Sequence, residues 1–192
     1  MKWWEKTVEY KFIKEYINLD SFIAPLDGKE EKAGDAIFGK NEKFILIEFK
    51  KDENSIKDEQ KKFFNFNSAK QKLEDKDSHH ILIYGEIDNK DLILNAKTYF
   101  SKNYIELSKN FTNGKILEDF KNYLSDFLEF KKGSKTESGS GSYGFVAGVT
   151  QEGNITKCLT LQEFDKEMSL NLNVKKNITN TQSNSYSRGL GM

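Results

Sequence analysis

The sequence predicts one α/β domain in which a mixed central β-sheet is flanked by helices. Short apolar runs of strand length alternate with longer segments whose large apolar residues repeat at helical spacing. The length of 192 residues suits one hydrophobic core of ordinary size. Although 31% of the side chains are charged, 15 Phe and 8 Tyr residues supply large rings for that core.

Charge and cysteine content narrow the classes of function. The 30 basic and 30 acidic side chains cancel, so a surface that binds a polyanion must be a local patch. Cys158 is the single cysteine, which excludes an intrachain disulfide and fits a reducing compartment. Met1–Lys14 lacks the apolar core of a secretory signal, and the apolar run Phe44–Ile47 is too short to cross a bilayer. We therefore expect a cytoplasmic protein without membrane contact.

The amino-terminal part predicts a helix followed by a hairpin. From Trp3 to Ile17 the large apolar residues recur near the helical period, which is typical of an amphipathic helix. A loop follows over Asp20–Ala33. Asp35–Phe38 and Phe44–Lys50, joined by a short connection, predict a β-hairpin with a strongly apolar second strand.

The middle of the chain predicts two more helices and two more strands. Ser55–Asp75 contains neither proline nor glycine, which favours one continuous helix. His80–Gly85 and Leu92–Ala96 are apolar runs of strand length. Ile116–Phe130 repeats Leu and Phe at helical spacing, which predicts the last helix of the main domain.

A change of composition after Phe130 divides the chain. We expect residues 1–130 to form the main domain and Lys131–Ser142, rich in Gly, Ser and Lys, to form a flexible linker. Residues 143–192 would then be a small extension. Within it Tyr143–Thr150 and Asn154–Leu161 predict a hairpin, followed by an irregular tail.

The segment with the clearest chemistry is the predicted hairpin. Side chains alternate along a strand, so Glu48 and Lys50 share one face, and pairing would bring Asp35 beside them. Two carboxylates offer the hard oxygen ligands that Mg²⁺ prefers, and a neighbouring ammonium offsets charge on a phosphoryl group. Asp35, Glu48 and Lys50 are therefore the candidate catalytic residues of a phosphodiesterase.

A carboxylate on the first helix is a further candidate. Glu9 precedes Phe12, Ile13 and Tyr16 at spacings that place it on the buried side of that helix. Glu5 lies one turn earlier on the same stripe and is the competing choice. Either residue is expected to reach the metal ion or its water.

These residues resemble the PD-(D/E)XK, or restriction-endonuclease-like, nuclease superfamily. The similarity consists of Asp35, twelve intervening residues, Glu48-Phe49-Lys50 and a preceding helical glutamate. Gln60, shortly before Phe63, resembles the glutamine motif of the virus-type replication-repair and RecB-like nucleases. The first helix and its loop are similar to archaeal Holliday junction resolvases. Gly34 stands where the proline of the motif is expected, a replacement that is common in the superfamily.

The resemblance implies a restriction-endonuclease-like fold and a metal-dependent endonuclease that acts on DNA, in repair or phage defence. Asp35 and Glu48 would bind Mg²⁺ or Mn²⁺, together with the backbone carbonyl of Phe49. Lys50 would assist the attacking water, and Gln60 and Lys61 would contact the scissile strand. Many enzymes of this fold act as homodimers, which fold analogy alone does not establish.

Other interpretations stay open at this point. The same fold can serve as a nucleic-acid-binding or protein-binding module without turnover, with the C-terminal extension as its contact to a protein partner. Cleavage of RNA is a third interpretation, since the metal chemistry does not discriminate between sugars. His79-His80 is more often structural than metal-binding, because neighbouring strand residues face opposite ways and no further His or Cys completes a zinc set.

Overall fold

The computed structural model describes residues 2–17, 41–107, 111–131 and 144–168. Its centre is a six-stranded sheet of order β4-β3-β2-β1-β5-β6, in which β1 and β2 run parallel and all other neighbours run antiparallel. The predicted α/β class with a mixed sheet and flanking helices is therefore confirmed. In the described residues no helix is long and apolar enough to span a membrane.

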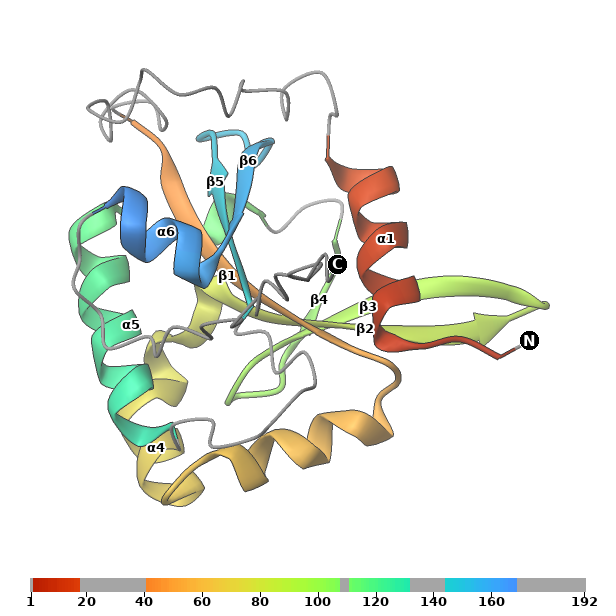
Figure 1. Cartoon of the computed structure of the whole chain (residues 1–192), viewed down its shortest axis with the longest axis horizontal. Coiled ribbons are helices and arrows are strands. Elements are labelled where there is room, and N and C mark those ends of the chain that lie inside the picture. The colour runs from red at the N-terminus through yellow and green to blue at the C-terminus, as the bar shows by residue number, and fades with distance from the viewer. Residues whose placement is uncertain (1, 18–40, 108–110, 132–143, 169–192) are drawn as a thin grey trace, which may run out of the picture.

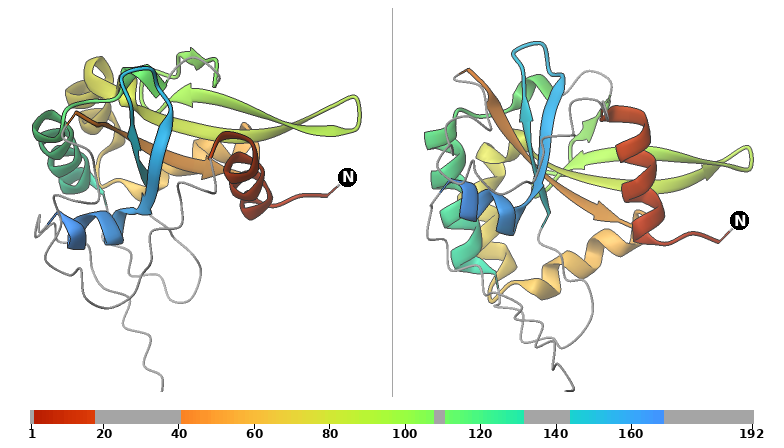
Figure 2. Two further views of the ribbon diagram at one scale, coloured as in Figure 1. Left: turned by 90° about the horizontal axis from the view of Figure 1, so that it is seen from above. Right: turned by 45° about the horizontal axis from the view of Figure 1, so that its top comes forward.

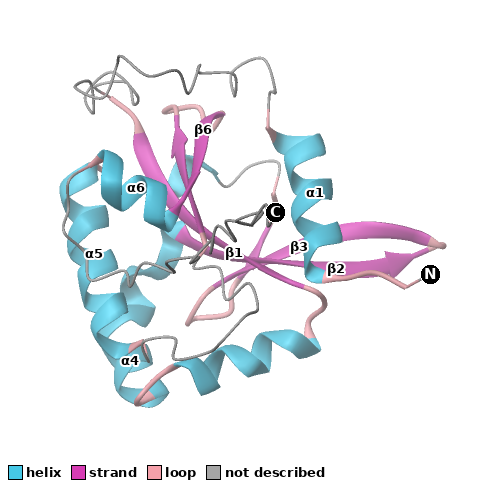
Figure 3. Cartoon of the chain, viewed as in Figure 1, coloured by secondary structure: helices cyan, strands magenta, loops and turns pink. Residues whose placement is uncertain are grey.

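The six strands of the sheet come from widely separated parts of the chain. In chain order they are β1 (Lys43–Lys50), β2 (His80–Asp88), β3 (Asp91–Thr98), β4 (Tyr104–Ile105), β5 (Phe145–Val149) and β6 (Ile155–Thr160). The connection from β1 to the parallel strand β2 consists of η1 (Asn54–Lys62), α4 (Phe66–Leu73) and η2 (Glu74–His79). In Figure 3 this helical crossover begins below the sheet, and α4 then lies beside α5.

Helices cover both faces of the sheet. Helix α1 (Glu5–Tyr16) packs Val8 and Phe12 against Ile45 and Ile47 of β1. The opposite face is covered by α4, by α5 (Leu117–Phe130) and by the short helix α6 (Leu161–Glu167). The two views of Figure 2 show α1 apart from α4 and α5, and the β2–β3 hairpin extending past α1. Because both faces are covered, β1 is buried along most of its length.

Both edges of the first part of β1 are paired with other segments of the described chain. Along Lys43–Ile47 one edge of β1 pairs with β5. On the other edge Phe44 pairs with Lys115, and β2 pairs from Leu46 onward. Strands from distant parts of the chain therefore lie beside β1 on both sides. Asp35–Phe38 and the predicted loop Asp20–Ala33 lie outside the described residues, and the predicted hairpin stays a prediction.

The predicted helix Ser55–Asp75 is wrong as a continuous element. Phe63 has an extended backbone (φ −104°, ψ 150°) and is buried against the core, where it bridges to Lys131. Asn65 then begins the new helix α4, since its side chain accepts a hydrogen bond from the Ser68 amide at 3.1 Å. Burial of the Phe63 ring thus interrupts a segment that local propensity would keep helical.

The predicted C-terminal hairpin is confirmed as β5 and β6, and its position was not foreseen. Rather than standing apart, β5 lies beside β1 in the central sheet, so residues 144–168 share the core with the preceding domain. Lys131, predicted as the first linker residue, is buried. Residues 132–143 lie outside the described part of the chain.

Candidate active site around Glu48 and Lys50

The end of β1 places two charged side chains on one buried face, as the alternation predicted. Glu48 and Lys50 lie on the side of the sheet where Phe44 and Leu46 meet α5, while Ile47 and its odd-numbered neighbours face α1. Only 4% of Glu48 and 5% of Lys50 is exposed. Charges buried to this extent require partners, which define the rest of the site.

The Lys50 ammonium is surrounded by three carboxylates. Its Nζ atom lies 2.8 Å from Glu59, 3.9 Å from Glu48 and 3.9 Å from Glu5. Burial by itself would lower the pKa of Lys50, but these carboxylates outweigh it and hold the pKa above its usual value. Lys50 is therefore a cation throughout the physiological pH range.

Glu59 is the most tightly held carboxylate of the site. It accepts from Lys62 at 2.6 Å and Tyr99 at 2.7 Å, in addition to Lys50 at 2.8 Å and Lys131 at 3.1 Å. Burial would raise the pKa of Glu59, but Lys131, Lys50 and Lys62 together hold it far below its usual value.

The contacts of Glu48 with neighbouring nitrogen atoms are longer than those of Glu59. Its carboxylate lies 3.5 Å from Lys131, 3.7 Å from His80 Nε2 and 3.9 Å from Lys50. Burial and the neighbouring Glu59 act to raise its pKa, yet the charges of Lys131 and Lys50 hold the pKa below its usual value. Glu48 is thus an ionised carboxylate, and among the described residues the nearest ammonium, that of Lys131, lies at the long distance of 3.5 Å.

Lys131 completes the charge balance from the end of α5. Its ammonium donates to Tyr99 at 2.9 Å and lies over the rings of Phe63, Phe127 and Tyr99 at 4.8, 4.7 and 5.2 Å from their centroids. Two buried ammonium groups therefore face two buried carboxylates. The aromatic faces stabilise the Lys131 cation where water is excluded.

Two residues of this site escaped the sequence analysis although their spacing carried a signal. Glu59 follows the buried Ile56 by three positions and precedes the buried Phe63 by four, so it lies on the buried stripe of its segment. Lys131 follows Phe127 by four positions on the apolar stripe of α5. In each case the charged residue type suggested a solvent-exposed side chain, whereas its spacing from apolar residues indicated a buried one.

The residues predicted to contact the substrate point elsewhere. Gln60 is exposed, and Lys61 pairs with Asp58 at 2.6 Å, with 80% of its own side chain exposed. Neighbouring residues of a helical turn diverge, so the burial of Glu59 directs both side chains away from the Glu48–Lys50 pair. Their contact with a scissile strand stays a prediction.

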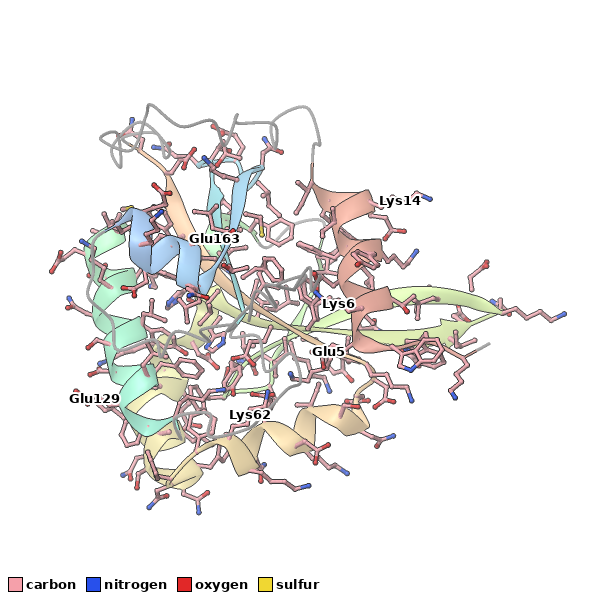
Figure 4. All side chains as sticks on the ribbon, in the orientation of Figure 1. Glu5, Lys6, Lys14, Lys62, Glu129 and Glu163 are labelled. Carbon is pink, nitrogen blue, oxygen red and sulfur yellow. The ribbon has the colours of Figure 1, made fainter. Side chains whose placement is uncertain are left out.

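The structure distinguishes the two candidate acids of the first helix. Glu9 is buried and pairs with Lys6 at 2.7 Å, on the α1 side of the sheet near Cys158. Glu5, at the start of α1, is the one whose carboxylate reaches Lys50. Figure 4 labels Glu5 and, at the end of η1, Lys62, the two partly exposed residues that border the site.

The fit to a divalent cation rests on Glu48. Mg²⁺ is commonly held by one or two carboxylates and retains several waters. Glu48 fits one such position because its contacts to neighbouring ammonium groups are long. In the described residues no three His, Cys, Asp or Glu side chains gather as a ligand set. Asp35 lies outside this part of the chain, and the Phe49 carbonyl stays a predicted ligand.

Comparison of the chain with protein-family models, with curated proteins and with solved structures found no match. The geometry of the site therefore carries the functional argument.

Proposed function

We propose that this protein is a metal-dependent phosphodiesterase of the PD-(D/E)XK type that cleaves DNA. The observation that carries the proposal is the buried Glu48–Lys50 pair on an interior strand of a mixed sheet. Charges on a solvent-exposed strand would need no explanation. Burial of both charged groups costs desolvation free energy, and a catalytic role accounts for that cost better than a stabilising one does. Glu48 and Asp35 would hold Mg²⁺ or Mn²⁺.

The side chains of the site suit hydrolysis of a phosphodiester. Lys50 is a fixed cation, so it offsets negative charge that develops on the phosphoryl oxygens and does not act as a base. Glu48, ionised and loosely contacted, can accept a positive ligand. A bound divalent cation supplies Lewis-acid stabilisation of the same oxygens.

The test is a metal-titrated cleavage assay on duplex, single-stranded and branched DNA and on RNA. Glu48→Gln keeps the shape of the side chain and removes its charge, so we expect cleavage to fall at least about 100-fold. Asp58→Asn removes a carboxylate from the exposed side of η1 and should cleave like the wild type. Equal cleavage by wild type and Glu48→Gln, or cleavage that persists in chelator, would refute the proposed site. Cleavage of RNA alone would change the substrate class.

A second candidate is a binding module on the same fold, without turnover. The favouring observation is that Lys50 and Lys131 already balance the charges of Glu48 and Glu59. Metal-independent binding of a nucleic acid or protein partner, with no cleavage of any substrate, would support this alternative. Homodimer formation and a cytoplasmic location are further parts of the proposal, to be checked by sedimentation and by fractionation.

A further inference from the structure

Glu59 joins more elements of the site than any other residue described above. Its Oε1 atom accepts from Lys50 of β1 at 2.8 Å and from Lys62 of η1 at 2.6 Å. Its Oε2 atom accepts from Lys131 at 3.1 Å and from Tyr99, which follows β3, at 2.7 Å. Four donors fill the roughly four lone-pair positions of a carboxylate.

The donors on Oε2 are themselves held in place. The Tyr99 ring is fully buried and stacks on the imidazole of His80 with 4.0 Å between ring centroids. Lys131 sits among aromatic rings and donates to the Tyr99 hydroxyl at 2.9 Å. Because these groups come from a strand end and a helix end of the packed core, the Glu59 carboxylate has little freedom to move.

The position of the Lys50 ammonium follows from this. Three carboxylates face it: Glu48 of β1, Glu5 of α1 and Glu59 of η1. Only Glu59 is within hydrogen-bonding distance, at 2.8 Å, and the other two lie at 3.9 Å. Since Coulomb attraction favours close approach, Lys50 would move toward Glu48 if Glu59 lost its charge.

We infer that Glu59 is a positioning residue that holds the Lys50 ammonium away from Glu48 and so leaves the Glu48 carboxylate available to a positive ligand. The role of that ligand in cleavage rests on the proposed function. The contact between Glu59 and Lys50 does not, and it can be tested without activity.

The experiment compares Glu59→Gln with Glu59→Asp and Asp58→Asn. The first removes the charge and keeps the shape, and the second keeps the charge but shortens the reach by one methylene. The third removes an adjacent, exposed carboxylate that pairs with Lys61. The readout is the distance from Lys50 Nζ to the nearer Glu48 carboxylate oxygen, in crystal structures of the full-length wild type and variants.

In Glu59→Gln we expect Lys50 Nζ to move from 3.9 Å to within about 3 Å of the Glu48 carboxylate, because the nearest charge that attracts it is lost. Glu59→Asp should show a smaller movement, and it serves as the test if the Gln variant does not fold. Asp58→Asn should keep the wild-type distance. An unchanged distance in the folded Glu59 variants would overturn the inference.

The catalytic consequence is measured separately. With Mg²⁺ present, Glu59→Gln should lower kcat about 100-fold while KM stays within about threefold, since substrate contacts are kept and the charged groups of the site are displaced. Full-rate cleavage by Glu59→Gln would overturn the positioning role and leave the proposed function standing. If the wild type cleaves nothing, the proposed function fails, and the distance between Lys50 and Glu48 in the variants still decides the role of Glu59.

Discussion

The imidazole of His80 faces the carboxylate of Glu48 across 3.7 Å, with both side chains buried. The Nδ1 atom of His80 shares a 2.9 Å hydrogen bond with the Tyr123 hydroxyl, and its ring stacks on Tyr99. The distance to Glu48 is too long for a hydrogen bond. Burial lowers the pKa of His80, although Glu48 opposes this, so the ring is neutral. His80 and Lys131 thus lie near Glu48, at 3.7 and 3.5 Å, without a short hydrogen bond to its carboxylate.

Binding of a divalent cation should stabilise the protein through Glu48. A cation that binds only the folded state at 100 times its Kd adds about 2.7 kcal/mol to the free energy of unfolding. We expect Mg²⁺ or Mn²⁺ to raise the Tm of the wild type, measured by thermal unfolding at fixed ionic strength. Glu48→Gln and Asp35→Asn should lose this rise, while Asp58→Asn should keep it. Equal shifts in all four proteins would place the cation elsewhere.

Removal of the Glu59 charge should cost more stability than removal of the Glu48 charge. Glu59→Gln leaves Lys50 and Lys131 without their nearest carboxylate, and breaking a buried ion pair in this way costs about 3 to 5 kcal/mol. The contacts of Glu48 are longer, so Glu48→Gln should cost about 1 to 2 kcal/mol. Urea unfolding of both variants measures the difference, and the reverse order would contradict the assigned contacts.

Protonation of His79 should destabilise the fold below neutral pH. Burial lowers the pKa of His79 from its ordinary 6.5 to about 3. The unfolded chain therefore binds a proton that the folded chain does not, and stability falls as the pH drops below about 6.5. Between pH 7 and pH 5 this loss is about 2 kcal/mol for one such histidine.

The check is His79→Phe, which keeps a ring against Tyr123, whose centroid lies 4.4 Å away. Urea unfolding at pH 7 and pH 5 should show a loss smaller by about 2 kcal/mol than in the wild type. His80 keeps its own contribution of the same sign in both proteins. An identical pH dependence would show that His79 titrates normally.

A methyl group at Gly144 should disturb the junction between β5 and the site. A Cβ atom there would lie 2.1 Å from the Ile47 carbonyl oxygen and 2.9 Å from Glu48 Cγ. Gly144→Ala should therefore cost about 3 kcal/mol, at the upper end of the usual range for overpacking, and impair the site as well. Gly85→Ala is the matched control, because the three nearest atoms to its Cβ, in Leu92, Trp3 and Val8, belong to side chains rather than to the backbone. Equal stability of the two variants would contradict this close approach.

Local periodicity was sufficient for much of the secondary structure. The first helix, the apolar strand that ends at Lys50, the β2–β3 pair and α5 all appear close to their predicted bounds. The shared face of Glu48 and Lys50 followed directly, because alternation in a strand is fixed by backbone geometry. The existence of the C-terminal hairpin was likewise readable from its two short strands and turn.

Patterns along the chain thus specify most of the elements and the face on which the Glu48–Lys50 pair lies. The place of β5 beside β1 and the entry of Glu59 and Lys131 into the site follow from the three-dimensional packing alone. Periodicity reports which side of an element is buried. The partner on that side is chosen by packing between residues far apart in the chain, as Lys131 and Glu48 are.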